Sequence, residues 1–64
     1  MNKFEDRFIR EREVCHIAGV SRSTIWRWEK SGHFPSRIIL YGSIAVWKYS
    51  EVIDWWHRQS SAAA

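Results

Sequence analysis

A single glycine divides two short helical patterns near the start of the chain, and this feature most constrains the fold. Residues 11–18 repeat apolar side chains at helical spacing. Gly19 follows them, and glycine takes the positive φ of a sharp corner at little steric cost. Ser21 comes two residues later, where a hydroxyl can accept from the free amides of a new helix. These residues predict a helix over Glu11–Ala18 and a tight turn over residues 19–21.

The second helical pattern covers roughly Arg22–Ser31. Gly32 is typical of a left-handed helix terminator, and Pro35 soon after it prevents the helix from continuing. Ile25 and Trp28 lie on one side of this helix. Ser23, Arg27 and Lys30 lie on the other side, and Arg22 occupies the first turn. Two helices joined by so short a turn predict a helix-turn-helix, a motif whose second helix commonly enters the DNA major groove.

The remaining residues predict a hairpin and a closing helix. The runs Ile38–Tyr41 and Ile44–Trp47 are β-branched and aromatic, and Gly42-Ser43 separates them, as expected for two strands and their turn. A third helical pattern begins at Ser50 and continues through Arg58. The predicted fold is therefore mainly α with a small β-hairpin, the architecture of a miniature winged helix-turn-helix.

The 64 residues are enough for one small domain. A chain of this length buries only about 60% of its unfolded surface, so its core needs large side chains. Five tryptophans meet that need, and we expect Trp28, Trp47 and Trp55 in the core. We expect a flexible lead-in over residues 1–8, the DNA-binding domain over residues 9–59 and a frayed tail over residues 60–64.

The net charge of +3 is concentrated in one segment. Residues 1–20 carry four basic and four acidic side chains, and beyond residue 37 two basic side chains cancel two acidic ones. Residues 21–37 carry four basic side chains against Glu29, a balance of +3. A protein that binds nucleic acid carries its charge where phosphates will lie. This distribution favours double-stranded DNA as the partner.

Each basic residue of the second helix has a predicted role and an alternative. Arg22 and Arg27 suit bidentate contacts to guanine, each worth about 1–3 kcal/mol of discrimination, and Lys30 suits a phosphate. The alternative is that they are solvated surface residues. Thr24 either binds a phosphate or caps its own helix. Trp26 stacks beside the sugar-phosphate backbone, which we favour, packs on the wing or completes the core. The residues predicted here to contact DNA are Arg22, Ser23, Thr24, Trp26, Arg27, Lys30 and Arg37.

The sequence shows no pattern of a metal site, a catalytic site or a phosphate-binding loop. His16, His33, His57 and the single Cys15 lack the short spacings of metal ligands, and Cys15 lies on the packing side of its helix. No glycine-rich phosphate loop is present, so we expect neither an enzyme nor a cofactor. The charged start of the chain is unlike a signal peptide, and no apolar run nears the ~20 residues of a membrane span. We expect a cytoplasmic, nucleoid-associated protein.

Three segments together resemble the AlpA family of prophage regulators, which have a MerR-like winged helix-turn-helix related in shape to phage excisionases. They are the stretch from Val14 to Arg27, the run Gly32-His33-Phe34-Pro35, and the stretch from Trp47 to Trp55. The resemblance implies DNA binding near prophage or mobile-element promoters, commonly to control integrase or excision genes. An excisionase-like factor that bends DNA to direct recombination is the alternative within this class. By the resemblance, Lys48 joins the DNA-contacting residues, as the basic residue that follows the wing tryptophan.

The wing departs from the family pattern. Where the family tends to carry basic residues and a Gly-Gly-Arg-like tip, this chain has Ile39, Tyr41-Gly42-Ser43 and Ile44. Strict alternation along the strand also predicts that Val46 faces away from Trp47. We expect these apolar residues to form a contact patch for a second copy or another protein. A protein-interaction module that docks through Ile39, Ile44 and Val46 is therefore the alternative from a different class.

Overall fold

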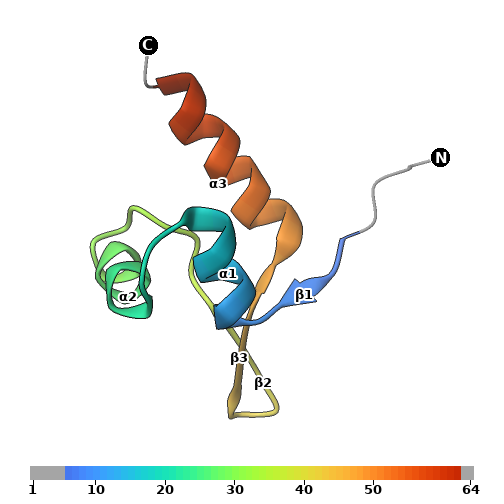
Figure 1. Cartoon of the computed structure of the whole chain (residues 1–64). Coiled ribbons are helices and arrows are strands. Elements are labelled where there is room, and N and C mark those ends of the chain that lie inside the picture. Colours follow the sequence, from blue (N-terminus) through green and yellow to red (C-terminus); the bar gives the residue numbers. More distant parts are fainter. Residues whose placement is uncertain (1–5, 63–64) are drawn as a thin grey trace, which may run out of the picture.

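The computed structural model describes residues 6–62, which form three helices and a small sheet (Figure 1). The chain is mainly α with one β-hairpin, and it has the arrangement of a winged helix-turn-helix, as predicted. The elements are β1 (Phe8–Ile9), α1 (Glu11–Ala18), α2 (Arg22–Lys30), β2 (Ile38–Leu40), β3 (Ile44–Lys48) and α3 (Tyr49–Ala62).

The corner between α1 and α2 forms through the two residues that predicted it. Gly19 has φ +75° and its amide donates to the carbonyl of Cys15 at 2.7 Å, which closes α1 in the left-handed conformation. Ser21 is extended, and its Oγ accepts from the Thr24 amide at 3.4 Å. Gly32, with φ +82°, follows the last turn of α2. The predicted bounds of α1 and α2 are thus confirmed.

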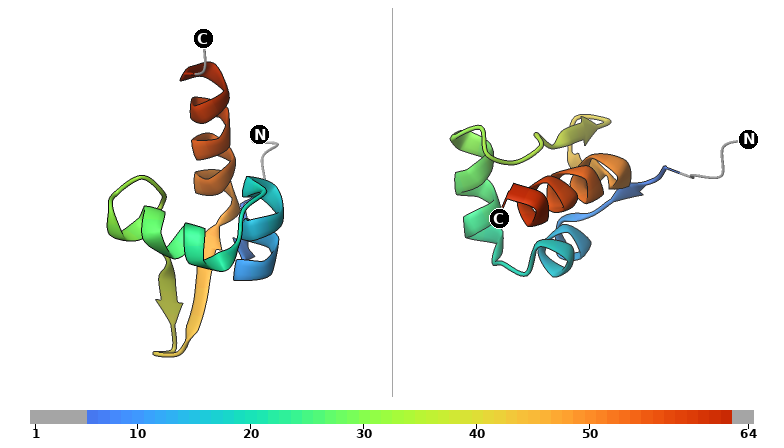
Figure 2. Two further views of the ribbon diagram at one scale, coloured as in Figure 1. Left: turned by 60° about the vertical axis from the view of Figure 1, so that its left-hand side comes forward. Right: turned by 90° about the horizontal axis from the view of Figure 1, so that it is seen from above.

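The sheet is antiparallel, with β3 at its centre and β1 and β2 at its edges. Ile38 pairs with Val46, and Ile9 pairs with Trp47 on the other side of β3. The β2–β3 hairpin closes through a turn in which Tyr41 (φ +52°) and the glycine after it both have positive φ, as in a type I′ turn. The hairpin and α3 project from opposite sides of the body (Figure 2).

The core lies where α1, α2, α3 and the base of the sheet meet. Trp47 is fully buried, and the rings of Phe34 and Trp55 meet edge to face with centroids 4.7 Å apart. Trp28 is half-buried and lies against Trp55 at 5.7 Å, so it closes the rim of the core. Residues of the core are Ile9, Val14, Ile25, Phe34, Trp47, Val52 and Trp55.

Sequence analysis placed a flexible lead-in over residues 1–8. In the structure, the first described residues of that segment are bonded to the start of α3. The Asp6 carboxylate accepts from the Ser50 amide at 3.0 Å and from the Ser50 hydroxyl at 2.8 Å. The Tyr49 amide donates to the carbonyl of Arg7 at 2.8 Å. These bonds satisfy free donors at the beginning of α3 with acceptors from far along the chain. Residues 6–8 therefore belong to the folded domain, and residues 1–5 lie outside the described part.

Residues 60–62, assigned to a frayed tail, lie at the end of α3, while residues 63 and 64 lie outside the described part. One expectation about the wing needs correction. Val46, expected at the exposed surface of the wing, is only 3% exposed. By strand alternation it faces away from Trp47, but it lies in the central strand β3 and pairs with Ile38 of β2. A β-residue on the second face of a central strand can thus be buried as well.

Candidate nucleic-acid interface

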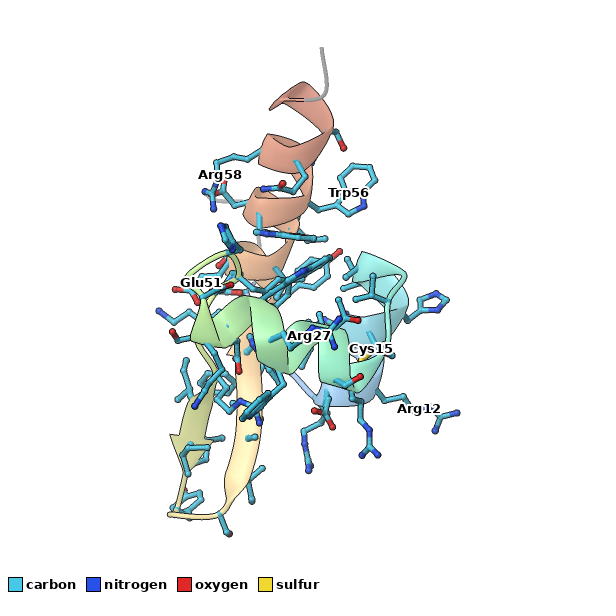
Figure 3. The ribbon with its side chains drawn as sticks, turned by 90° about the vertical axis from the view of Figure 1, so that its left-hand side faces the viewer. Arg12, Cys15, Arg27, Glu51, Trp56 and Arg58 are labelled. Atoms are coloured by element: carbon cyan, nitrogen blue, oxygen red, sulfur yellow. The ribbon has the colours of Figure 1, made fainter. Side chains whose placement is uncertain are left out.

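The outer side of α2 carries its polar and basic residues, and the inner side carries Ile25, which is fully buried. Figure 3 looks onto this helix, with Arg27 labelled on it. Arg22, Trp26 and Lys30 recur at steps of four and form one exposed stripe, because such residues stack along a helix. The stripe and its exposed neighbours Ser23 and Arg27 make up what we call the outer face of α2. The DNA major groove is wide enough to admit one α-helix.

Two contacts organise this outer face. The Lys30 Nζ lies 4.8 Å from the ring centroid of Trp26, a cation–π arrangement at the surface. Arg27 donates through Nη2 to the Thr24 Oγ1 at 3.3 Å. The Thr24 hydroxyl also lies 3.2 Å from the Ser21 Oγ, so it takes part in the cap of its own helix. Trp26 is 51% exposed and therefore lies outside the core.

Arg22 lies at the mouth of a shallow hollow at the beginning of α2. Its Nη1 is 3.7 Å from the Glu11 Oε1, and its side chain is 77% exposed. An ion pair this long and this exposed adds little stability and leaves the guanidinium available to other anions. The hollow brings together four of the predicted contact residues with two neighbours: Glu11, Ser21, Arg22, Ser23, Trp26 and Arg37.

Arg37 differs from the other predicted contact residues because an acidic residue of α2 holds it. Its Nε donates to the Glu29 Oε1 at 2.9 Å, and Nη2 lies 2.8 Å from the same oxygen. The guanidinium also lies over the ring of Trp47, 5.1 Å from its centroid. Since only 29% of the Arg37 side chain is exposed, its charge is largely neutralised within the fold. The cationic surface of this segment therefore consists of Arg22, Arg27 and Lys30.

Lys48 is exposed, but it is not brought to the outer face of α2. Trp47 donates from Nε1 to Glu29 of α2 at 3.1 Å, so α2 lies on the Trp47 side of β3. Adjacent residues of a strand point to opposite faces, which places Lys48 on the other side. It lines a second groove together with Glu51 and Arg58 of α3, and Arg37 lines both this groove and the hollow at the beginning of α2.

Two exposed arginines at the beginning of α1 escaped the sequence analysis. The net charge of residues 1–20 is zero, but only some of their basic side chains form ion pairs. Glu13 is engaged by Arg7 at 2.7 Å, which leaves Arg10 and Arg12 without an ion pair among residues 6–62. Figure 3 shows Arg12 at the α1 side of the molecule. Arg7 and Glu13 are six positions apart, which is not the spacing of neighbours on a helix, and Arg7 precedes α1. The sequence therefore did not predict this ion pair.

The titratable groups do not form a reactive cluster. Burial raises the pKa of the Cys15 thiol, and the nearby Glu11 adds to this, so the thiol is a poor nucleophile at neutral pH. Among residues 6–62, no three His, Cys, Asp or Glu side chains lie close enough to hold a metal ion. No helix in the same part of the chain has the length and apolar character to cross a membrane.

Comparisons with known proteins agree with this architecture. The family of the prophage CP4-57 regulatory protein (AlpA) matches residues 7–60. The uncharacterized protein ORF88 of Enterobacteria phage P4 is 43% identical over 51 residues, which cover 80% of this chain. The matched region is 58% of the length of the phage protein. No solved structure matches the chain significantly. The extent of the family match shows that the chain belongs to the AlpA family of prophage regulatory proteins.

Proposed function

We propose that this protein is a sequence-specific DNA-binding transcriptional regulator of a prophage or mobile element, acting on integrase or excision genes. The observation that carries the proposal is the outer face of α2, where Arg22, Arg27 and Lys30 are all exposed while Ile25 of the same helix is buried. A rigid helix backed by a core is the element that enters a major groove in helix-turn-helix proteins. Membership of a prophage regulatory family supplies the biological setting.

The side chains divide into those that read bases and those that hold the backbone. Arg22 and Arg27 are bidentate donors for guanine O6 and N7, since both have guanidinium groups that no buried carboxylate neutralises. Lys30 and Trp26 act together on the sugar-phosphate backbone, the lysine as a point charge and the indole as an apolar flank. Ser23 and Thr24 donate to phosphate at the beginning of the helix, and Lys48 reaches a phosphate beside the wing.

The test is the salt dependence of DNA binding. Duplexes selected from a random pool by the wild-type protein are titrated over a range of KCl concentrations. Each lost phosphate contact reduces the slope of log K against log salt by about 0.9. The triple variant Arg22→Ala, Arg27→Ala, Lys30→Ala should lose about 0.9 in slope with the Lys30 phosphate contact, and all preference for the selected duplex with the two arginines. Arg58→Ala is the matched control, because Arg58 is paired with Asp54 on α3. An unchanged slope and preference in the triple variant would refute the assignment.

The apolar wing supports a second role, in assembly of copies on DNA. Ile39 is 50% exposed, Tyr41 is 95% exposed and Ile44 is 36% exposed. Residues 38–46 contain no charged side chain, and β2 is an edge strand. Edge strands that avoid self-pairing usually carry charges or prolines. Since one small module makes few base contacts, pairing with a second copy through β2 would double them.

The assembly role predicts cooperative binding. Ile39→Lys places a charge on the edge strand and should leave binding to a single site intact while it removes cooperativity on duplexes with two sites. Sedimentation of the protein on both duplexes measures the number of copies bound. Two copies bound independently by both proteins would refute self-pairing, and a partner protein would then be the occupant to seek.

A further inference from the structure

One acidic side chain of α2, that of Glu29, joins the helix to β3 and to the residue that precedes β2. The Glu29 carboxylate is 10% exposed. Its Oε2 accepts from the Arg37 amide at 2.9 Å and from the Trp47 Nε1 at 3.1 Å, while its Oε1 accepts from the Arg37 Nε at 2.9 Å. Both carboxylate oxygens therefore have partners, which is the condition for keeping such a charge nearly buried.

The partners of Glu29 lie where the hairpin leaves the body. Arg37 directly precedes β2, and Trp47 lies in β3. The Trp47 Nε1 also donates to the carbonyl of Pro35 at 3.1 Å, so the loop between α2 and β2 is included. A single carboxylate thus ties the helix that we propose reads DNA to β3 and to the residue that precedes β2, and Trp47 ties the loop to β3. Charged hydrogen bonds of this kind are short and directional, and they fix orientation more than neutral ones do.

The charge of Glu29 works against DNA binding in general. An acidic residue on a reading helix repels phosphate, and its removal alone would strengthen binding to every duplex. Here Arg37 neutralises it at close range, 2.8 Å from Nη2 to Oε1. The hydrogen bonds that Glu29 makes, and not its negative charge, therefore account for an acidic residue at this position of α2.

We propose that Glu29 is a positioning residue that sets the angle between α2 and the wing, and through that angle the selectivity for one DNA site. The inference rests on the proposed function, since it requires that α2 reads DNA. Glu29 itself touches no base or phosphate in this proposal. It acts through Arg37 and Trp47, which hold the wing in register with the helix.

The decisive variant is Glu29→Gln. For the selected duplex, loss of the charge should raise the affinity, whereas loss of the positioning bonds should lower it. Loss of the negative charge should raise affinity for a scrambled duplex. Loss of the charged bonds to Arg37 should lower affinity for the selected duplex, so that the ratio of the two affinities falls about tenfold or more. Glu51→Gln is the matched control: Glu51 is exposed on α3, and the same change of charge there should leave the ratio unchanged.

Other variants separate selectivity from stability. Ile25→Val destabilises the core without touching the Glu29 contacts, and it should keep the wild-type ratio when assayed below its melting temperature. Glu29→Asp and Arg37→Lys keep the net charge while they misplace the bonds, and each should lower the ratio. These two variants decide the matter if Glu29→Gln melts below the assay temperature.

The outcomes of these assays test the positioning role of Glu29 separately from the proposed DNA-binding function. If the wild-type protein prefers no duplex, the proposed function fails. If the wild-type protein is selective and the Glu29 and Arg37 variants keep its affinity ratio, the function stands and the positioning role is overturned. A reduced ratio in the folded Glu29 and Arg37 variants, with Ile25→Val and Glu51→Gln unchanged, supports it.

Discussion

Replacement of Trp47 by phenylalanine tests the bonds that anchor the hairpin. Trp47 is fully buried, and its Nε1 donates to Glu29 and to the carbonyl of Pro35, both at 3.1 Å. Phenylalanine keeps an aromatic ring in the core but removes that donor. Glu29 retains the two donors of Arg37, whereas the Pro35 carbonyl loses its indole partner.

The expected loss can be worked from these contacts. A buried acceptor left without its donor costs about 1–3 kcal/mol. The smaller ring also leaves a gap of at least a methyl group, which costs about 1 kcal/mol more. The sum of about 2–4 kcal/mol is large beside the roughly 3–10 kcal/mol expected for a domain of 64 residues. At about 4–8 °C per kcal/mol, the melting temperature should fall by at least about 8 °C.

Thermal unfolding followed by far-ultraviolet circular dichroism measures this effect. Trp56→Phe is the control, because Trp56 is 44% exposed and the same chemical change there should stay within about 0.5 kcal/mol. A shift below about 4 °C for Trp47→Phe, or equal shifts for the two variants, would mean that the indole bonds do not support the hairpin.

Two further predictions concern titratable groups. Bonds from the Ser50 amide and then the Ser50 hydroxyl lower the pKa of Asp6, so its stabilising effect is present above its ordinary pKa and is lost as the pH falls through the folded value. Asp6→Asn should therefore lower the urea midpoint at pH 7 and have a smaller effect at acidic pH, below the ordinary pKa of an aspartate, and an equal loss at both would contradict the reasoning. Burial raises the pKa of Cys15, so iodoacetamide at about pH 8 should modify the folded chain more slowly than the urea-unfolded chain. Equal rates would show that the thiol is not packed.

Local signals in the sequence were sufficient for most of the fold. Gly19 and Ser21 marked the corner of the helix-turn-helix because both act on their own backbone. Gly42 likewise marked the hairpin turn. The strand Phe8–Ile9 was missed as a strand, since two residues carry no periodicity and become a strand only by pairing with β3.

The candidate site was predictable in composition but not in its internal pairing. The helical wheel placed Arg27 outward and Ile25 inward, and the structure agrees. Arg37 counted as a free cation because Glu29 lies eight positions away, beyond any helical spacing, and the loop brings them together. Val46 was misjudged for a related reason: alternation gives the face of a residue but not what covers that face.

The hydrogen bonds between Asp6 and Ser50 join residues 44 positions apart in the chain. During synthesis on a ribosome, residues 6–9 emerge early and must wait until residues 47–50 have also left the exit tunnel. Because β1 pairs with β3, the amino-terminal strand can dock only after the hairpin has formed.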